Sequence, residues 1–190
     1  ILYGNRGSGK SDVCCLWKAH ADDSCNAGQH LDNQVTGSIS NRLSQDKAFA
    51  RKHKDPVYST FSGSGDRLKQ SSTCLVGATS VQDMMKALRT HAPGVKNPFA
   101  EGTVNSVCMH FGGVVGDHST SSMIVELKDD IEVWVTGTST PCVSLFKPYR
   151  FGDVPTAPVY DEHDPAAEAY WRKAELFRRT LLCHELPPEF

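Results

Sequence analysis

The sequence predicts an α+β protein with an antiparallel sheet, on three observations. The apolar, β-branched segments Ser121 to Leu127 and Ile131 to Thr136 are separated by Lys128-Asp129-Asp130, which is typical of a hairpin. A helix with a clear start signal precedes this hairpin, and a longer helix follows it. Helix, antiparallel strands and helix in this order favour a layered α+β architecture.

The first helix is predicted to begin after Ser80. Ser80 is a suitable N-cap, and Asp83 three residues later completes a capping-box pattern with Asp in the place of Glu. Apolar residues then recur at the spacing of one helix face, and Pro93-Gly94 ends the segment. These apolar residues are Val81, Met84, Met85 and Leu88. We expect them to pack in the core.

The second helix is predicted to begin at Pro165, because proline is well tolerated as the first helical residue, and to end before Pro187-Pro188. The acidic run Asp161-Glu162-His163-Asp164 lies directly before it. We interpret this run as a solvated helix start that the helix dipole favours, and not as a metal site.

Further elements are expected on weaker signals. Strands are predicted at Val104 to Phe111, at Val143 to Phe146 and within residues 35–43, and a short helix at Val13 to Trp17. Residues 44–73 are rich in Ser, Lys, Gly and Asp, and we expect a surface excursion there. The chain of 190 residues is expected to form a single domain, 1–190, without internal repeats.

Composition excludes several classes of function. The chain has 20 Lys+Arg against 22 Asp+Glu, a balance that gives no electrostatic basis for binding nucleic acid. No apolar run is long enough to span a membrane. The seven cysteines are scattered without paired spacing, which favours reduced, buried thiols in a cytoplasmic protein. Cys108 and Cys142 in particular are predicted to be packed thiols.

Residues Gly4 to Ser11 match the phosphate-loop pattern GxxxxGK[ST] completely. In such a loop, backbone N–H groups surround phosphate oxygens, the lysine reaches the outer phosphates and the hydroxyl binds Mg²⁺. A strand must precede the loop and a helix must follow it. However, no later apolar strand ends in the aspartate that such enzymes need. Nucleotide binding therefore stays an alternative.

From about Val35 to Leu182 the chain resembles the secernins and related dipeptidases, which are N-terminal nucleophile hydrolases. The resemblance covers about three quarters of the chain and is carried by an ordered series of segments. These are VTGSISNRLS (35–44), SVQDMMKALRTH (80–91), NSVCMHFGG (105–113), STSSMIVEL (119–127), VWVTGTSTPCVSLFKPY (133–149) and YWRKAELFRRTLL (170–182).

The resemblance implies a partial αββα four-layer sandwich with antiparallel sheets, the C-terminal portion of such a domain. In that family the nucleophile is a cysteine at the mature N-terminus, whose own α-amino group is the general base. The chain begins with Ile1, so we interpret it as a fragment that is inactive as given. Its supporting site residues would be Asn41, as an oxyanion-side amide, and His110, as a polar group facing the substrate; a turn-stabilising Asn and a satisfied sheet histidine are the alternatives.

Three functions are thus left open. The first is a cysteine-dependent amide hydrolase of the dipeptidase class, whose missing N-terminal part supplies the nucleophile. The second is a non-catalytic structural or interaction subunit on the same fold, and the third is the nucleotide-binding protein. We expect small peptides or protein partners, no cofactor and no metal, and possible assembly into a homo-oligomer or larger complex.

Overall fold

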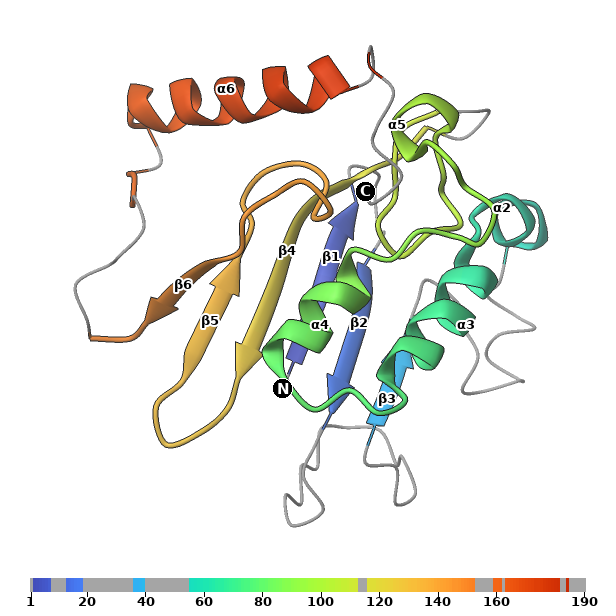
Figure 1. Ribbon diagram of the computed structural model, residues 1–190, viewed down its shortest axis with the longest axis horizontal. Helices are drawn as coiled ribbons and strands as arrows, with labels where there is room; N and C mark the ends of the chain where they lie inside the picture. Colours follow the sequence, from blue (N-terminus) through green and yellow to red (C-terminus); the bar gives the residue numbers. More distant parts are fainter. Residues whose placement is uncertain are drawn as a thin grey trace.

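The computed structural model describes residues 2–7, 13–18, 36–39, 55–112, 116–152, 159–161, 163–181 and 184. Six strands form one antiparallel sheet in the order β3-β2-β1-β4-β5-β6 (Figure 1). The strands are β1 (Leu2–Gly7), β2 (Val13–Lys18), β3 (Thr36–Ile39), β4 (Ser119–Glu126), β5 (Glu132–Val135) and β6 (Lys147–Arg150). The helices are α2 (Pro56–Phe61), α3 (Ser64–Leu75), α4 (Val81–Leu88), α5 (Pro98–Glu101) and α6 (Pro165–Leu181). The α+β prediction is confirmed.

Helices α3 and α4 lie across the same face of the sheet (Figure 1). Helix α4 contacts β4 and β1, and α3 contacts β2 and β3. Side chains alternate across the pleat of a strand, so Ile124 of β4 is fully buried whereas its neighbour Met123 is half exposed. The core under α4 consists of Leu75, Ala78, Val81, Met84, Ala87, Leu88 and Ile124.

The predicted capping box, the hairpin, the start of the C-terminal helix and the strand within residues 35–43 are confirmed. Asp83 N–H donates to Ser80 Oγ at 3.2 Å, and Ser80 N–H donates to Asp83 Oδ2 at 3.1 Å, so the capping box forms as predicted. The predicted hairpin is β4 paired with β5, and α6 begins at Pro165. The strand expected within residues 35–43 is β3.

The phosphate-loop geometry is not found. The first half of the motif lies in β1, which pairs on one side with β2 and on the other with β4. The segment Val13 to Trp17, predicted as a helix, is part of strand β2. Residues 8–12 lie outside the described part of the chain. The described residues on either side of this gap are thus antiparallel strands, and they include no helix N-terminus of the kind that binds phosphate.

Two predicted strands need correction. Residues 104–111 form no strand, and the segment is closed by one isolated bridge between Thr103 and His110. Residues 143–146 lie in a turn and in the short irregular segment after it, and the strand begins only at Lys147, as β6. Pro148 is tolerated in β6 because this is an edge strand, where a missing N–H leaves no ladder bond broken.

The surface excursion expected over 44–73 is helical from Pro56 to Phe61 and from Ser64 onward, while 44–54 lie outside the described residues. The reason is Arg67, which is 1% exposed and donates from Nη1 to the carbonyl oxygens of Ser62 and Val104. A polar sequence thus forms a helix with one buried face, on which the arginine satisfies a backbone carbonyl of a distant loop.

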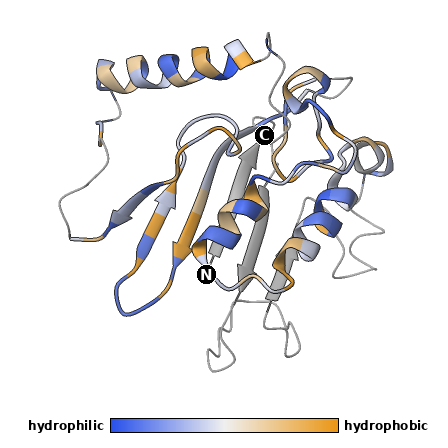
Figure 2. Cartoon of the chain, in the orientation of Figure 1, coloured by the Kyte–Doolittle hydropathy of each residue, from blue (hydrophilic) through white to orange (hydrophobic). Residues whose placement is uncertain are grey.

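Helix α6 buries charge and exposes apolar side chains. Glu175 and Arg178 are buried and paired, with Arg178 Nε and Nη2 at 3.1 and 3.0 Å from Glu175 Oε2. Leu176 and Phe177 are 67% and 55% exposed, and Figure 2 shows apolar and polar residues mixed along the helix. Lys147 on β6 donates to the Tyr170 hydroxyl at 3.1 Å. The Lys147–Tyr170 bond joins α6 to β6, whereas the Glu175–Arg178 pair lies within the helix.

Candidate metal centre

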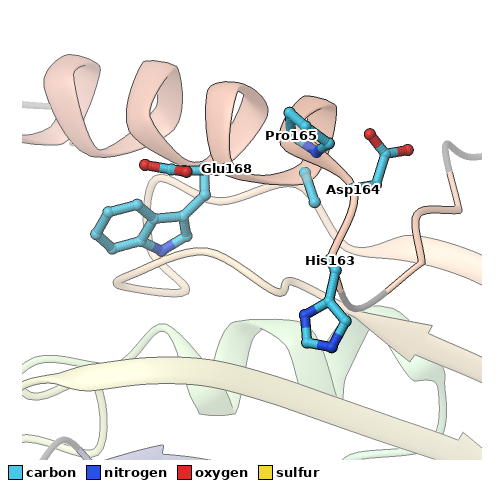
Figure 3. A pocket seen from close by; sticks show the side chains of 6 residues that line it. His163, Asp164, Pro165 and Glu168 are labelled. Atoms are coloured by element: carbon cyan, nitrogen blue, oxygen red, sulfur yellow. The ribbon is translucent and has the colours of Figure 1, made fainter.

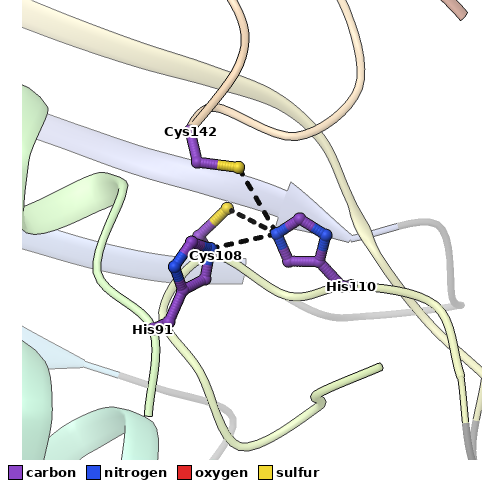
Figure 4. Close-up of side chains that lie close together, drawn as sticks. All are labelled: His91, Cys108, His110 and Cys142. Atoms are coloured by element: carbon purple, nitrogen blue, oxygen red, sulfur yellow. Dashed lines mark hydrogen bonds between the residues drawn. The ribbon is translucent and has the colours of Figure 1, made fainter. Parts of the chain in front are cut away.

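Four side chains from three separate segments converge at one point (Figure 4). His91 follows the end of α4, and Cys108 and His110 lie in the loop closed by the Thr103–His110 bridge. Cys142 lies in the turn between β5 and β6. The ligand atoms of the four residues all lie within 4.8 Å of one another, and no other group of three or more such residues is this compact in the described part of the chain.

The contacts of the His110 ring are not those of an ordinary hydrogen bond. Its Nε2 lies 3.0 Å from His91 Nε2, 3.5 Å from Cys108 Sγ and 3.4 Å from Cys142 Sγ. A ring nitrogen carries either one hydrogen or one lone pair, so it can make at most one good hydrogen bond of these three. At most one of the three contacts at His110 Nε2 can therefore be a good hydrogen bond, and the other two are close approaches without one.

A shared metal ion accounts for the same distances. With zinc–sulfur bonds of about 2.3 Å and zinc–nitrogen bonds of about 2.05 Å, a tetrahedral site has nitrogen–nitrogen edges of about 3.3 Å and nitrogen–sulfur edges of about 3.5 Å. The observed contacts of 3.0, 3.5 and 3.4 Å lie close to these edges. Two sulfur and two nitrogen ligands in a tetrahedron are the donor set that zinc prefers.

The protonation states favour metal binding at two of the residues. Burial is the largest effect on His110 and lowers its pKa, which keeps the ring neutral, as a metal ligand must be. The adjacent Cys108 thiol and then the rings of His110 and His91 lower the pKa of the Cys142 thiol, although burial opposes them. Burial raises the pKa of Cys108, so this thiol would lose its proton on metal binding.

Hydrogen bonds between the segments hold the ligands in place. Cys108 N–H donates to the carbonyl oxygen of Thr90 at 2.9 Å, and Ala92 N–H donates to Ser106 Oγ at 2.7 Å. These two bonds join the chain on either side of His91 to the loop that carries Cys108. The edge of the Phe99 ring packs on His110, with centroids 4.6 Å apart. The site is thus preorganised around two buried ligands, Cys108 and His110, and two half-buried ones, His91 and Cys142.

One atom of the site departs from the usual pattern. His110 Nδ1 is buried and has no hydrogen-bond partner among the described residues. Metal-bound histidines commonly donate their second ring N–H to a carboxylate, a carbonyl oxygen or a water molecule. The orientation of His110 is therefore set by the packing of Phe99 and by its contacts at Nε2.

The structure brings together some of the residues expected from sequence and not others. His110, predicted as a polar group facing substrate, is at the centre of the cluster. Asn41 lies outside the described residues. Cys108 and Cys142, predicted to be packed thiols, are indeed free thiols, but both face His110. His91 was not expected in a site, and the short spacing of Cys108 and His110 was the signal that could have indicated a metal centre.

The described residues of the acidic run before α6 form no comparable site. A hollow of about 550 Å³ is lined there by His163, Asp164, Pro165, Ala167, Glu168 and Trp171 (Figure 3). Asp164 Oδ1 accepts the Ala166 N–H at 2.8 Å, which caps the helix, and Glu168 pairs with Arg172. Both carboxylates are thus used by the helix itself, in agreement with the interpretation of this run as a helix start.

No helix in the described ranges is both long and apolar enough to cross a membrane. No protein-family model, no curated protein and no solved structure matches the chain.

Proposed function

We propose that the chain binds one zinc ion through His91, Cys108, His110 and Cys142. The observation that carries this proposal is the position of His110 Nε2, within 3.5 Å of three other ligand atoms that it cannot all satisfy by hydrogen bonding. A Zn²⁺ ion at the centre would take one bond from each ligand and would remove this conflict.

The proposed role of the ion is structural. Four protein ligands fill a tetrahedral zinc site and leave no open position for water or substrate, as is the rule in structural sites. The ion would join the end of α4 to two segments that have little regular structure of their own, residues 102–112 and 136–146. Because the ligands come from distant parts of the chain, the binding free energy would contribute directly to folding.

The direct test is metal content and cobalt substitution. The purified protein should contain about one zinc per chain, and Co²⁺ in its place should give the visible absorption and the thiolate charge-transfer bands of a tetrahedral Cys₂His₂ site. Cys108→Ser and Cys142→Ser should each lose most of the metal. Cys74→Ser is the matched control, because Cys74 is a free thiol outside the cluster. Wild-type protein that takes up neither metal would overturn the proposal.

A second candidate is amide hydrolysis of the dipeptidase class, in a cytoplasmic protein acting on small peptides. One observation favours it, in addition to the ordered segments of the resemblance: an antiparallel sheet with two helices across one face, which is what half of an αββα sandwich requires. The same sheet and helices are also compatible with a non-catalytic structural or interaction subunit on this fold.

The dipeptidase candidate is tested on the full reading frame of the natural gene. The expected result is a cysteine exposed at a processed N-terminus and turnover of dipeptides that is lost when this cysteine is changed to alanine. A full-length protein without such a cysteine, or one whose dipeptide turnover survives its removal, would contradict this candidate. The zinc proposal does not depend on the outcome.

A further inference from the structure

Arg89 connects the segment of one proposed ligand to the segment of another. It lies at the C-terminal end of α4, two residues before His91. Its Nε donates to the carbonyl oxygen of Pro141 at 2.8 Å, and its Nη2 donates to the carbonyl oxygen of Ser144 at 2.9 Å. The two acceptors lie on either side of Cys142 in the sequence, so the guanidinium holds the backbone on both flanks of the ligand.

Apart from Arg89, the turn that carries Cys142 is held by its own contacts and by one backbone bond to β4, from the Thr140 N–H to the Ser119 carbonyl oxygen at 3.1 Å. Ser144 Oγ accepts from the Thr138 hydroxyl at 2.8 Å and donates to the carbonyl oxygen of Ser139 at 3.1 Å. Thr140 has a φ of 43°, a left-handed conformation that is unfavourable for a β-branched residue. These contacts shape the turn and attach it to β4, whereas its attachment to the end of α4 comes from Arg89.

The chemistry of the guanidinium suits this role. Its N–H groups form a rigid, planar fork, so two donors fix both the distance and the direction of their acceptors. The Arg89 guanidinium also lies 5.1 Å from the centroid of the Phe146 ring, which restricts it from a third side. A lysine at this position would keep the charge but could not reproduce two bonds of fixed geometry.

We propose that Arg89 is a positioning residue of the metal centre, which holds Cys142 against the other three ligands through the carbonyl oxygens of Pro141 and Ser144. This inference rests on the proposed zinc binding. Arg89 itself does not contact the metal. Arg89 holds Cys142 in its ligand position already in the metal-free protein. Less conformational entropy is therefore lost when the ion binds.

The test compares Arg89→Lys with the wild type. Loss of an outer-sphere contact of this type costs about 10- to 100-fold in metal affinity, and we expect a weakening of zinc binding in that range. In the Co²⁺ form, the thiolate-to-cobalt charge-transfer intensity should fall toward that of Cys142→Ser, since one thiolate would be displaced. Arg172→Lys is the matched control, because Arg172 is an exposed arginine paired with Glu168 on α6.

A second readout needs no metal. In the metal-free protein, alkylation of Cys142 measured by peptide mass spectrometry should be faster in Arg89→Lys than in the wild type, with Cys74 unchanged. If Arg89→Lys fails to fold, Phe146→Leu decides, since it removes the ring beside the guanidinium and should shift affinity and cobalt spectrum in the same direction. Unchanged affinity, spectrum and alkylation in a folded variant would overturn the role of Arg89. Absence of metal in the wild type would instead refute the proposed zinc site.

Discussion

Gly102 and Gly112 approach each other so closely that a Cβ on Gly102 would lie 2.3 Å from the Gly112 Cα. The two glycines flank the Thr103–His110 bridge and close the loop that carries two of the proposed ligands. Gly102 also has a φ of +66°, which L-residues with a side chain rarely adopt. Both the conformation and the space at this position require glycine.

Gly102→Ala should therefore destabilise the protein and weaken metal binding together. Gly77 is a matched control, because it has a φ of +77° but nothing within 4 Å of an added Cβ. Gly77→Ala should cost about 1–2 kcal/mol from the backbone conformation alone. Gly102→Ala should cost clearly more in chemical denaturation, because backbone must also move. Equal losses for the two variants would show that the close approach has no energetic consequence.

Removal of the metal should lower the thermal stability of the wild type. A ligand at about 1,000 times its dissociation constant stabilises the folded state by about 4 kcal/mol, so a chelator should lower the melting temperature by several degrees. Cys142→Ser should melt at a lower temperature and no longer respond to the chelator. Cys74→Ser should respond as the wild type does. A chelator response that persists in Cys142→Ser would place the metal elsewhere.

The capping box of α4 makes a contribution that depends on pH. Hydrogen bonds from Thr79 and Ser80 lower the pKa of Asp83 from 3.8 to about 2. A carboxyl whose pKa is lowered on folding stabilises the folded state fully above its ordinary pKa, and this contribution is lost as the pH falls from about 4 to about 2. Asp83→Ala should therefore flatten the stability profile in this range.

Ser80→Ala tests the other half of the same box. Loss of an N-cap side chain costs about 1 kcal/mol, and we expect a decrease of that size in the free energy of unfolding at neutral pH. Because α4 packs on β4 and leads to His91, zinc affinity should fall only slightly. A loss well below half this value would show that water replaces the cap at no cost.

The docking of α6 should weaken in acid. Burial acts to raise the pKa of Glu175, but hydrogen bonds from Ser139 and Arg178 outweigh it and leave the pKa below its ordinary value. The ionised form thus stabilises docking above about pH 4.5, and this contribution is lost as the pH falls through the lowered pKa. We expect protection of residues 165–181 from hydrogen exchange, corrected for the intrinsic rate, to decrease in this range.

Glu175→Gln should remove most of that pH dependence and should weaken docking at neutral pH, because it leaves Arg178 buried without its counter-ion. Glu168→Gln is the control, since Glu168 is exposed and its pair with Arg172 lies on the helix surface. If both variants behave alike, the buried Glu175 carboxylate does not contribute to the docking of α6.

The sequence predicted correctly those elements whose signals lie within the element itself. It mispredicted segments whose structure depends on pairing with other parts of the chain. The capping residues of α4 and the proline at the start of α6 favour the start of a helix in almost any structural context. The apolar run Val13 to Trp17 does not, because so short a run is compatible with a helix or a strand. Its two neighbours in the sheet, β1 and β3, make it a strand. Similarly, the apolar residues near Cys108 are buried, but the segment turns back on itself through the Thr103–His110 bridge instead of extending.

By itself the sequence determined the α+β class, the helix after Ser80, the hairpin of β4 and β5 and the long C-terminal helix. Each of these follows from residues within one or two turns, whose propensities and hydrogen bonds act over short distances. The tertiary structure alone decided that β1 lies in the middle of the sheet and that His91, Cys108, His110 and Cys142 meet. These residues are separated by up to about fifty positions, and no local pattern encodes a contact that depends on how whole elements pack.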